Sequence, residues 1–193
     1  MIINKIHWLG VGLSSPPGIL YLKDEGYELL VWNRSVDKAQ SLLENKVNIN
    51  YLDLLNLSNQ LDENDLIVSM LPASMHFKIA ELAIKYKCHF VTSSYYDPQY
   101  EKLEQRFIDN DCLFVCECGL DPGIDHLLAH KIIQEFENNN YADIQSIEFK
   151  SMCGGFPEIP NNFKYKFSWS PLGVLKALHT PATYIENFSE KIS

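Results

Sequence analysis

The stretch Cys118-Gly119-Leu120-Asp121-Pro122-Gly123-Ile124-Asp125-His126 follows a short apolar run, residues 112–116, and precedes a pattern that is typical of a helix. Glycine, proline and aspartate supply the chemistry of a turn. Two aspartates, two glycines and a histidine in nine residues are more than a turn needs. A loop that leaves the carboxyl end of a strand and opens a helix is where open α/β sheets bind ligands. The alternative is an ordinary turn with an aspartate N-cap.

The sequence before this loop alternates between apolar runs and helical patterns. Strands are predicted at residues 2–9, 28–32, 47–51, 65–71, 88–92 and 112–116, with helices between them. This alternation predicts an α/β fold of the Rossmann type, a doubly wound parallel sheet covered by helices on both faces. After about residue 140 the rhythm changes: residues 144–150 alternate like a half-buried strand, and residues 171–179 favour a helix. We expect residues 1–120 to form this Rossmann-type domain and residues 121–193 to be the start of an incomplete α+β domain.

Composition excludes several classes of function. The 193 residues carry a net charge of −9, which disfavours a surface for nucleic acid or an anionic membrane. No apolar run approaches the ~18 residues of a membrane span. The five cysteines form no CxxC pair and no zinc pattern, and most are expected to be buried thiols. Their odd number, without a signal peptide, predicts a reducing, cytoplasmic compartment.

A glycine pattern follows the first predicted strand. Gly10-x-Gly12 fits the dinucleotide fingerprint, in which the first glycine permits a tight turn and the second lets the backbone approach a pyrophosphate. The third position is Ser15 rather than glycine, and serine is small enough for close packing of helix on strand. An ordinary β–α turn is the alternative, but six alternating strands favour cofactor binding.

The end of the second strand bears on the choice of cofactor. NAD-preferring sites place an acidic residue there, whereas this chain has Asn33-Arg34-Ser35. A guanidinium forms charge-assisted, bidentate bonds with a 2′-phosphate, so we predict NADPH over NADH. A solvated surface arginine is the alternative for Arg34, and Ser35 is also a candidate helix cap. Asp53, after the third strand, is predicted either to accept from the adenine amino group or to be an N-cap.

Polar residues also follow the fourth and fifth strands. Residues 69–74 occupy the position where the nicotinamide-side ribose sits in such folds. Residues 92–98 supply three hydroxyl side chains and two tyrosines that can orient a polar substrate. A capped turn is the alternative for the second segment. Because the carboxyl ends of parallel strands meet at one edge of a sheet, we expect all these segments to converge there.

Several motifs together resemble the saccharopine dehydrogenase family of the NADP-dependent, L-glutamate-forming type. They are Ser93-Ser94-Tyr95, residues 119–126, Cys153-Gly154-Gly155 and Lys166-Phe167-Ser168-Trp169-Ser170-Pro171. The resemblance implies interconversion of saccharopine with glutamate and 2-aminoadipate 6-semialdehyde, in lysine metabolism, by hydride transfer at an imine carbon. It implies that NADP(H) is lined by residues of several loops, namely Gly10, Gly12, Leu13, Ser14, Asn33, Arg34, Ser35, Asp53, Leu54, Leu71, Leu120, Asp121, Pro122 and Ser170.

The resemblance also implies that Ser94 and Tyr95 contact a small amino-acid substrate, with Asp121 and Cys153 as ionisable groups near the imine. Imine formation and hydrolysis require proton transfers, which positioned side chains can provide. We rank Asp121 first as the catalytic residue, with Tyr95 and Cys153 second. The alternative is that all three only position the substrate.

Members of the family are longer than this chain, and their second domain supplies dimer contacts and an arginine for a substrate carboxylate. The only arginines here are Arg34 and Arg106, and Arg106 lies within a predicted surface helix. We therefore expect a fragment that forms a homodimer when full length or is completed by a second chain. Two further hypotheses are a related imine-reducing dehydrogenase of polyamine or amino-acid metabolism and an inactive NADPH-binding module.

Overall fold

A computed structural model describes residues 3–139, 147–167, 170–179 and 181–192. By packing, the chain divides into two compact units, Met1–Cys153 and Gly154–Ser193. The functional boundary expected after residue 120 stays a prediction. Among the residues described, no helix is long and apolar enough to cross a membrane.

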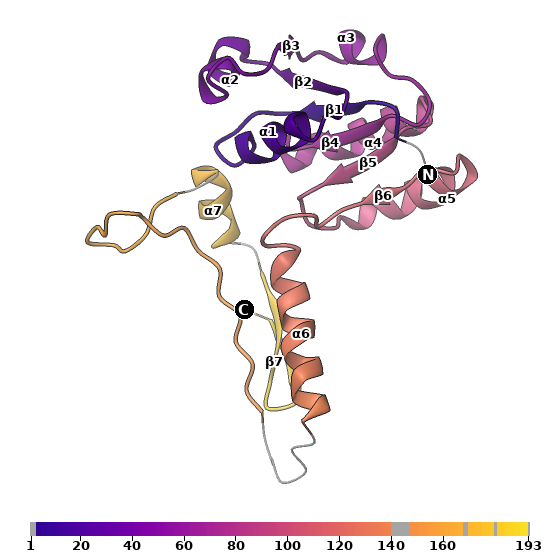
Figure 1. Ribbon diagram of the computed structural model, residues 1–193. Coiled ribbons are helices and arrows are strands. Elements are labelled where there is room, and N and C mark those ends of the chain that lie inside the picture. Colours follow the sequence, from indigo (N-terminus) through magenta and orange to yellow (C-terminus); the bar gives the residue numbers. More distant parts are fainter. Residues whose placement is uncertain (1–2, 140–146, 168–169, 180, 193) are drawn as a thin grey trace. The chain divides into compact units, whose positions relative to one another are not determined.

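The first unit contains a six-stranded parallel sheet in the order β3-β2-β1-β4-β5-β6 (Figure 1). The strands are β1 (Ile6–Leu9), β2 (Leu29–Asn33), β3 (Ile49–Tyr51), β4 (Leu66–Ser69), β5 (His89–Thr92) and β6 (Phe114–Val115). The order reverses direction at β1 and β4, so the crevice beyond their carboxyl ends is where such a sheet binds ligands. The predicted Rossmann-type architecture is confirmed.

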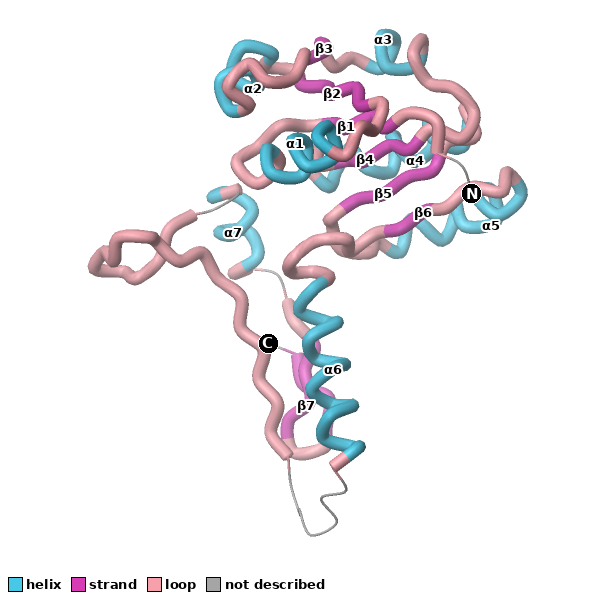
Figure 2. Tube along the Cα trace, in the orientation of Figure 1, coloured by secondary structure: helices cyan, strands magenta, loops and turns pink. Residues whose placement is uncertain are grey.

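Helices connect the strands of the sheet (Figure 2). They are α1 (Pro16–Asp24), α2 (Val36–Leu42), α3 (Leu54–Ser58), α4 (His76–Lys85) and α5 (Glu101–Asp109), with 3₁₀ turns at Ala73–Met75 and Pro98–Tyr100. Helix α6 (Ile124–Asn138) follows the glycine- and aspartate-rich loop after β6, and none of its residues is buried.

Two apolar clusters sandwich the sheet, because successive side chains of a strand point to opposite faces. Leu9, Ile67 and Phe90 join residues of α3, α4 and α5 in the larger cluster. Trp8 and Val31 join residues of α1 and α2 in the smaller one. Coverage of both faces explains why the central strands are nearly continuous apolar runs in the sequence.

The second unit, from Gly154 onward, holds a helix and a hairpin: α7 (Pro171–Ala177), β7 (Thr183–Glu186) and β8 (Ser189–Ile192). The hairpin was not expected from the sequence. The strand expected over residues 144–150 is wrong where it can be judged, since residues 147–150 are exposed and carry no regular structure. Residues 144–146 lie outside the described residues, as do Ser168 and Trp169 of the aromatic motif.

The expectation of buried thiols is correct for only part of the set. Cys88 and Cys112 are buried, whereas Cys118 and Cys153 are exposed and Cys116 is intermediate. Cys118 lies in a loop just after the apolar run 112–116, so an adjacent apolar run did not indicate burial for it.

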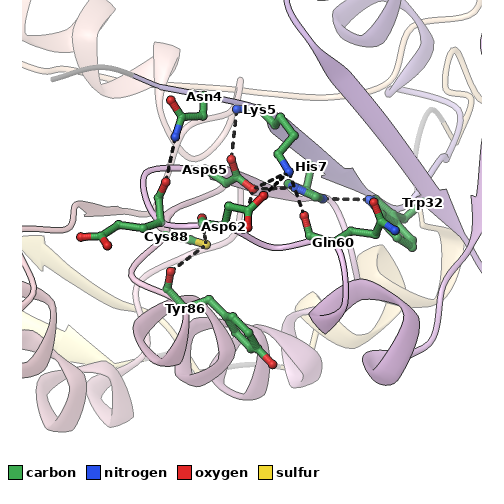
Figure 3. Close-up of polar contacts among 10 residues, drawn as sticks. Asn4, Lys5, His7, Trp32, Gln60, Asp62, Asp65, Tyr86 and Cys88 are labelled. Carbon is green, nitrogen blue, oxygen red and sulfur yellow. Dashed lines mark hydrogen bonds and ion pairs between the residues drawn. The ribbon is translucent and has the colours of Figure 1, made fainter.

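A buried polar network closes the amino end of the sheet (Figure 3). The indole Nε1–H of Trp32 donates to His7 Nδ1 at 3.2 Å, and His7 Nε2 lies 3.0 Å from Asp65 Oδ2. Because an indole N–H can only donate, His7 Nδ1 must carry the lone pair, and its hydrogen is on Nε2. Lys5 Nζ lies 3.7 Å from the same Asp65 oxygen and 2.6 Å from Asp62. His7 is therefore a neutral side chain with both nitrogens engaged.

This network predicts a loss of stability in mild acid. Burial lowers the pKa of His7 below its ordinary 6.5, and burial lowers that of His76 in the same way. Below about pH 6.5 the unfolded chain takes up protons that the folded chain does not. The free energy of unfolding is therefore expected to fall as pH decreases from 7.5 to 5.5, as measured by urea denaturation.

The variant His7→Gln provides the matched control for that prediction. A glutamine amide can donate to Asp65 and accept from Trp32, like the neutral imidazole, but it does not titrate. We expect His7→Gln to show a smaller loss between pH 7.5 and 5.5 than the wild type. An identical pH dependence in the two proteins would contradict the assignment.

Candidate cofactor and substrate site

The turn after β1 is closely packed at the carboxyl edge of the sheet. Gly10 has φ +94°, a conformation that favours glycine. A Cβ at Gly10 would lie 3.0 Å from the Met70 carbonyl oxygen and 3.2 Å from Leu71 Cδ2. Gly12 differs, because a Cβ there would meet no atom within 4 Å. Contacts within the protein require glycine at position 10. At position 12 they do not, and the open space there suits a ligand that approaches the backbone closely.

Ser15 has a different role from the packing role expected for it. Its buried hydroxyl donates to the Gly10 carbonyl and accepts from the Gly12 N–H, both at 3.2 Å. Close packing of helix on strand occurs instead at Gly18, where a Cβ would lie 2.8 Å from the Trp8 ring. The packing role of the third glycine in the fingerprint therefore belongs to Gly18, one helical turn after Ser15. The sequence pattern did not identify Gly18.

The prolines at the start of α1 alter the supply of N–H donors. Pro16 and Pro17 occupy the first turn and have no N–H, so this helix N-terminus offers fewer donors than usual. Leu13 and Ser14 are exposed, and among the residues described no hydrogen bond uses their N–H groups. A phosphate at this position would therefore rely on the loop amides of Leu13 and Ser14.

Replacement of Gly12 by alanine separates binding from folding. The added methyl group meets no protein atom, so we expect the free energy of unfolding to change by no more than about 0.5 kcal/mol. The same methyl group would occupy the path of the pyrophosphate, so NADPH affinity should fall at least tenfold by calorimetry. Full NADPH affinity in Gly12→Ala would show that the pyrophosphate does not bind at this loop.

The turn after β2 is tied to the glycine loop through Asn33. The Val11 N–H donates to Asn33 Oδ1 at 3.0 Å, and Asn33 Nδ2 donates to the Ser35 carbonyl at 2.9 Å. Ser35 occupies the N-cap position of α2, but its side chain accepts no capping bond, so its expected capping role is wrong. Arg34 is exposed, and its side chain forms no ion pair with any described residue. Its guanidinium is available to a 2′-phosphate.

Asp53 caps helix α3. Its Oδ1 accepts from the N–H groups of Leu55 and Asn56, both at 2.9 Å. Asn56 Nδ2 also donates to Oδ2 of the same carboxylate. Of the two interpretations of Asp53, the structure bears out the N-cap, and a contact with adenine stays a prediction. Leu54 is the first residue of this helix.

Tyr95 and Asp121 meet across the exits of β5 and β6. The Tyr95 hydroxyl donates to Asp121 Oδ1 at 2.8 Å. Partial burial raises the pKa of Tyr95 to about 12, and the hydrogen bond to Asp121 acts in the same direction. The phenol is therefore protonated at neutral pH and acts as a donor to the Asp121 carboxylate.

The loop that carries Asp121 is held by backbone bonds to the β5 exit. The Cys118 and Glu117 N–H groups donate to the carbonyls of Thr92 and Ser94, at 3.1 and 3.0 Å. Gly123 has φ +142°, and any Cβ there would collide with the Gly119 backbone. Leu120 is exposed and Pro122 is buried. The N-cap position of α6 is Gly123, so the alternative of an aspartate N-cap is wrong.

Two expected site residues lie at or beyond the boundary between the units. Cys153 is the last residue of the first unit, and its charge would raise the pKa of Tyr95 in the same direction as Asp121 does. Ser170 belongs to the second unit, where its Oγ caps α7 by accepting from the Gly173 N–H at 3.1 Å. Its expected contact with the cofactor stays a prediction.

His76 is a buried residue of this edge that the sequence patterns did not single out. Its Nε2 lies 2.7 Å from the Leu71 carbonyl oxygen and 3.4 Å from Ser94 Oγ. Of these two residues, Leu71 is expected to contact the cofactor and Ser94 is expected to contact the substrate. A polar side chain at the first position of a helix after a strand was the only available signal.

Comparison with known proteins identifies two family models that match successive parts of the chain. Residues 6–115 match the family model described as the saccharopine dehydrogenase NADP binding domain, and residues 119–192 match the saccharopine dehydrogenase C-terminal domain. The apo saccharopine dehydrogenase (L-Glu forming) of Saccharomyces cerevisiae superposes with a TM-score of 0.74 at 30% identity, over 98% of this chain and 44% of that chain.

The curated relatives are longer proteins. Saccharopine dehydrogenase (NADP(+), L-glutamate-forming) of Pyricularia oryzae is 33% identical over 97% of this chain, which spans 43% of that protein. The mitochondrial alpha-aminoadipic semialdehyde synthase of Bos taurus is 36% identical over 95% of this chain, which spans 20% of that protein. Residues 6–115 are thus an NADP-binding domain, and NADP(H) is its cofactor. The chain belongs to the saccharopine dehydrogenase family.

Proposed function

We propose that this chain carries the cofactor-binding part and a portion of the catalytic site of an NADP-dependent oxidoreductase of lysine metabolism. The reaction is the interconversion of saccharopine with L-glutamate and 2-aminoadipate 6-semialdehyde. The hydrogen bond from Tyr95 to Asp121 carries this proposal. It sets a carboxylate and a protonated phenol beside the exits of β5 and β6, on the sheet edge that also bears the glycine loop.

The cofactor fits the residues on this edge. Gly12 leaves open space, Leu13 and Ser14 are exposed with no hydrogen bond from their N–H groups among the residues described, and Arg34 has no ion pair there. These groups would hold the pyrophosphate and the 2′-phosphate. When bound, NADPH supplies hydride to the imine carbon in the reductive direction.

The proton transfers belong to Asp121 in this proposal. Its carboxylate takes a proton from the glutamate ammonium, which frees the amine to attack the aldehyde. The same proton then goes to the hydroxyl that leaves as water when the imine forms. Tyr95 keeps its own proton and donates to Asp121, which fixes the orientation of the carboxylate. Cys153 and Ser94 line the substrate in secondary positions.

We also propose a cytoplasmic location and, for a polypeptide that includes the rest of the second domain, a homodimer. An odd number of cysteines supports the first, since disulfides are rare in a reducing compartment. A second chain that supplies the remaining portion is the alternative to the homodimer. Gel filtration with light scattering distinguishes these assemblies.

Calorimetric titration of the chain with NADPH, and separately with NADH, tests the proposal at its base. We expect binding of NADPH and much weaker binding of NADH. A second titration adds saccharopine to the chain with NADPH present. Absence of binding by either nucleotide would refute the cofactor site. Binding of NADPH without any saccharopine response would favour the inactive module over the oxidoreductase.

A further inference from the structure

His76 stands between the exits of β4 and β5 with a defined tautomer. Its side chain is fully buried, and Nε2 lies 2.7 Å from the Leu71 carbonyl oxygen. A carbonyl oxygen only accepts, so the hydrogen of the imidazole must be on Nε2. Nδ1 then carries the lone pair, and it is buried without a hydrogen-bond partner among the residues described.

The surroundings of His76 keep it neutral and in place. The Phe90 ring meets it edge-on, with the ring centroids 6.2 Å apart. Burial lowers the pKa of His76, and the hydrogen bond to Leu71 opposes this effect only in part. At pH 7 the side chain is therefore an uncharged N–H donor in a fixed orientation.

The same Nε2–H group approaches Ser94. Ser94 Oγ lies 3.4 Å from His76 Nε2. The backbone of Ser94 is fixed independently, because its N–H donates to Thr92 Oγ1 at 3.2 Å and its carbonyl accepts from Glu117 at 3.0 Å. Because Nε2 carries its hydrogen, which it donates to Leu71, it has no lone pair to accept from Ser94, so the hydroxyl hydrogen of Ser94 turns away from His76. The Ser94 hydroxyl can then donate to a group on the side away from His76.

We propose that His76 is a positioning residue, which makes the Ser94 hydroxyl a donor toward a carboxylate of the substrate and holds the β4 exit against the β5 exit. This inference rests on the proposed function and deepens it, because it explains which chemical group Ser94 recognises. A hydroxyl that donates its hydrogen outward complements a carboxylate, which only accepts.

A double-mutant cycle tests the proposal with saccharopine as the probe and NADPH present. His76→Phe keeps the ring and removes the donor, and Ser94→Ala removes the hydroxyl. We expect each variant to bind saccharopine about tenfold more weakly than the wild type. Because His76 acts through Ser94, the double variant should lose no more than Ser94→Ala alone. Losses that multiply in the double variant would overturn the proposal, and so would unchanged affinity in His76→Phe.

Two further variants separate positioning from general structural support. His76→Gln retains an N–H donor and should recover saccharopine affinity to within about threefold of the wild type. His89→Phe is the matched control, since His89 is buried at the opposite end of β5 and accepts from the Leu113 N–H at 3.1 Å. It should lower stability without changing saccharopine affinity. An equal loss of affinity in His89→Phe would overturn the assigned role of His76.

The tautomer provides a readout that is independent of the proposed function. Long-range proton–nitrogen correlation spectra of the chain without ligand should show His76 in the Nε2–H form at pH 7. A charged imidazole or the Nδ1–H form would overturn the inference even if NADPH binds. Failure of the wild type to bind NADPH, with the Nε2–H form observed, would instead refute the proposed function. Binding of NADPH without saccharopine would overturn the recognition role of Ser94.

Discussion

Replacement of Asp121 by asparagine is expected to lower kcat about 100- to 1000-fold in a polypeptide that carries the whole second domain, which is the scale of general acid–base catalysis. Asparagine keeps the shape of the side chain and can still accept from Tyr95, as the Asp121 carboxylate does at 2.8 Å. It can no longer take up and return a proton. Steady-state oxidation of NADPH with glutamate and the semialdehyde measures the loss.

Two other variants show whether the loss in Asp121→Asn comes from proton transfer. Tyr95→Phe removes only the donor that orients the carboxylate, so we expect a smaller loss, about tenfold. Asp111→Asn changes an exposed aspartate whose φ of +54° asparagine also tolerates, and kcat should not change. Full turnover in Asp121→Asn would show that Asp121 only positions the substrate.

Replacement of Arg34 by alanine is expected to weaken NADPH binding about 10- to 100-fold and to leave NADH binding unchanged. The physical reason is the loss of charge-assisted bonds to the 2′-phosphate, which NADH lacks. Calorimetry with both nucleotides measures the selectivity directly. High salt should weaken the NADPH selectivity of the wild type, because the contact lies at an exposed side chain.

Arg106 offers a matched control for this selectivity. It is also half-exposed on the surface, but it lies 3.8 Å from Glu81 on the neighbouring helix. Arg106→Ala should bind both nucleotides like the wild type. If Arg34→Ala keeps its preference for NADPH, the 2′-phosphate must be recognised by other residues.

The parallel sheet could be predicted because its strands are buried on both faces. Val31, Ile67 and Phe90 are fully buried, and such strands are visible as apolar runs bounded by turn residues. The convergence of the loops then follows from topology. The pairing of Tyr95 with Asp121, 26 residues apart, was expected only as proximity, because a side-chain hydrogen bond depends on loop geometry that the sequence pattern does not contain.

The errors have physical causes of the same kind. The hairpin of β7 and β8 consists of exposed residues, so no periodic burial pattern marked it. Its turn places Asn187 and Phe188 at positive φ, and Asn-Phe lacks the glycine that usually indicates such a turn. Asp53 had two possible partners, and it bonds the N–H groups of α3, which follow it directly in the sequence. His76 was overlooked because a buried histidine carries no pattern of its own.

Asn33 bears on any attempt to convert this protein from NADPH to NADH. A protein engineer would first place aspartate at the end of β2, where NAD-dependent enzymes carry an acidic residue. At this position the Asn33 side-chain amide accepts from the Val11 N–H and donates to the Ser35 carbonyl, so it joins the turn after β1 to the turn after β2. A carboxylate would keep the first bond and set a negative charge against the Ser35 carbonyl. Redesign of nucleotide preference is therefore better directed at Arg34, with both hydrogen bonds of Asn33 left intact.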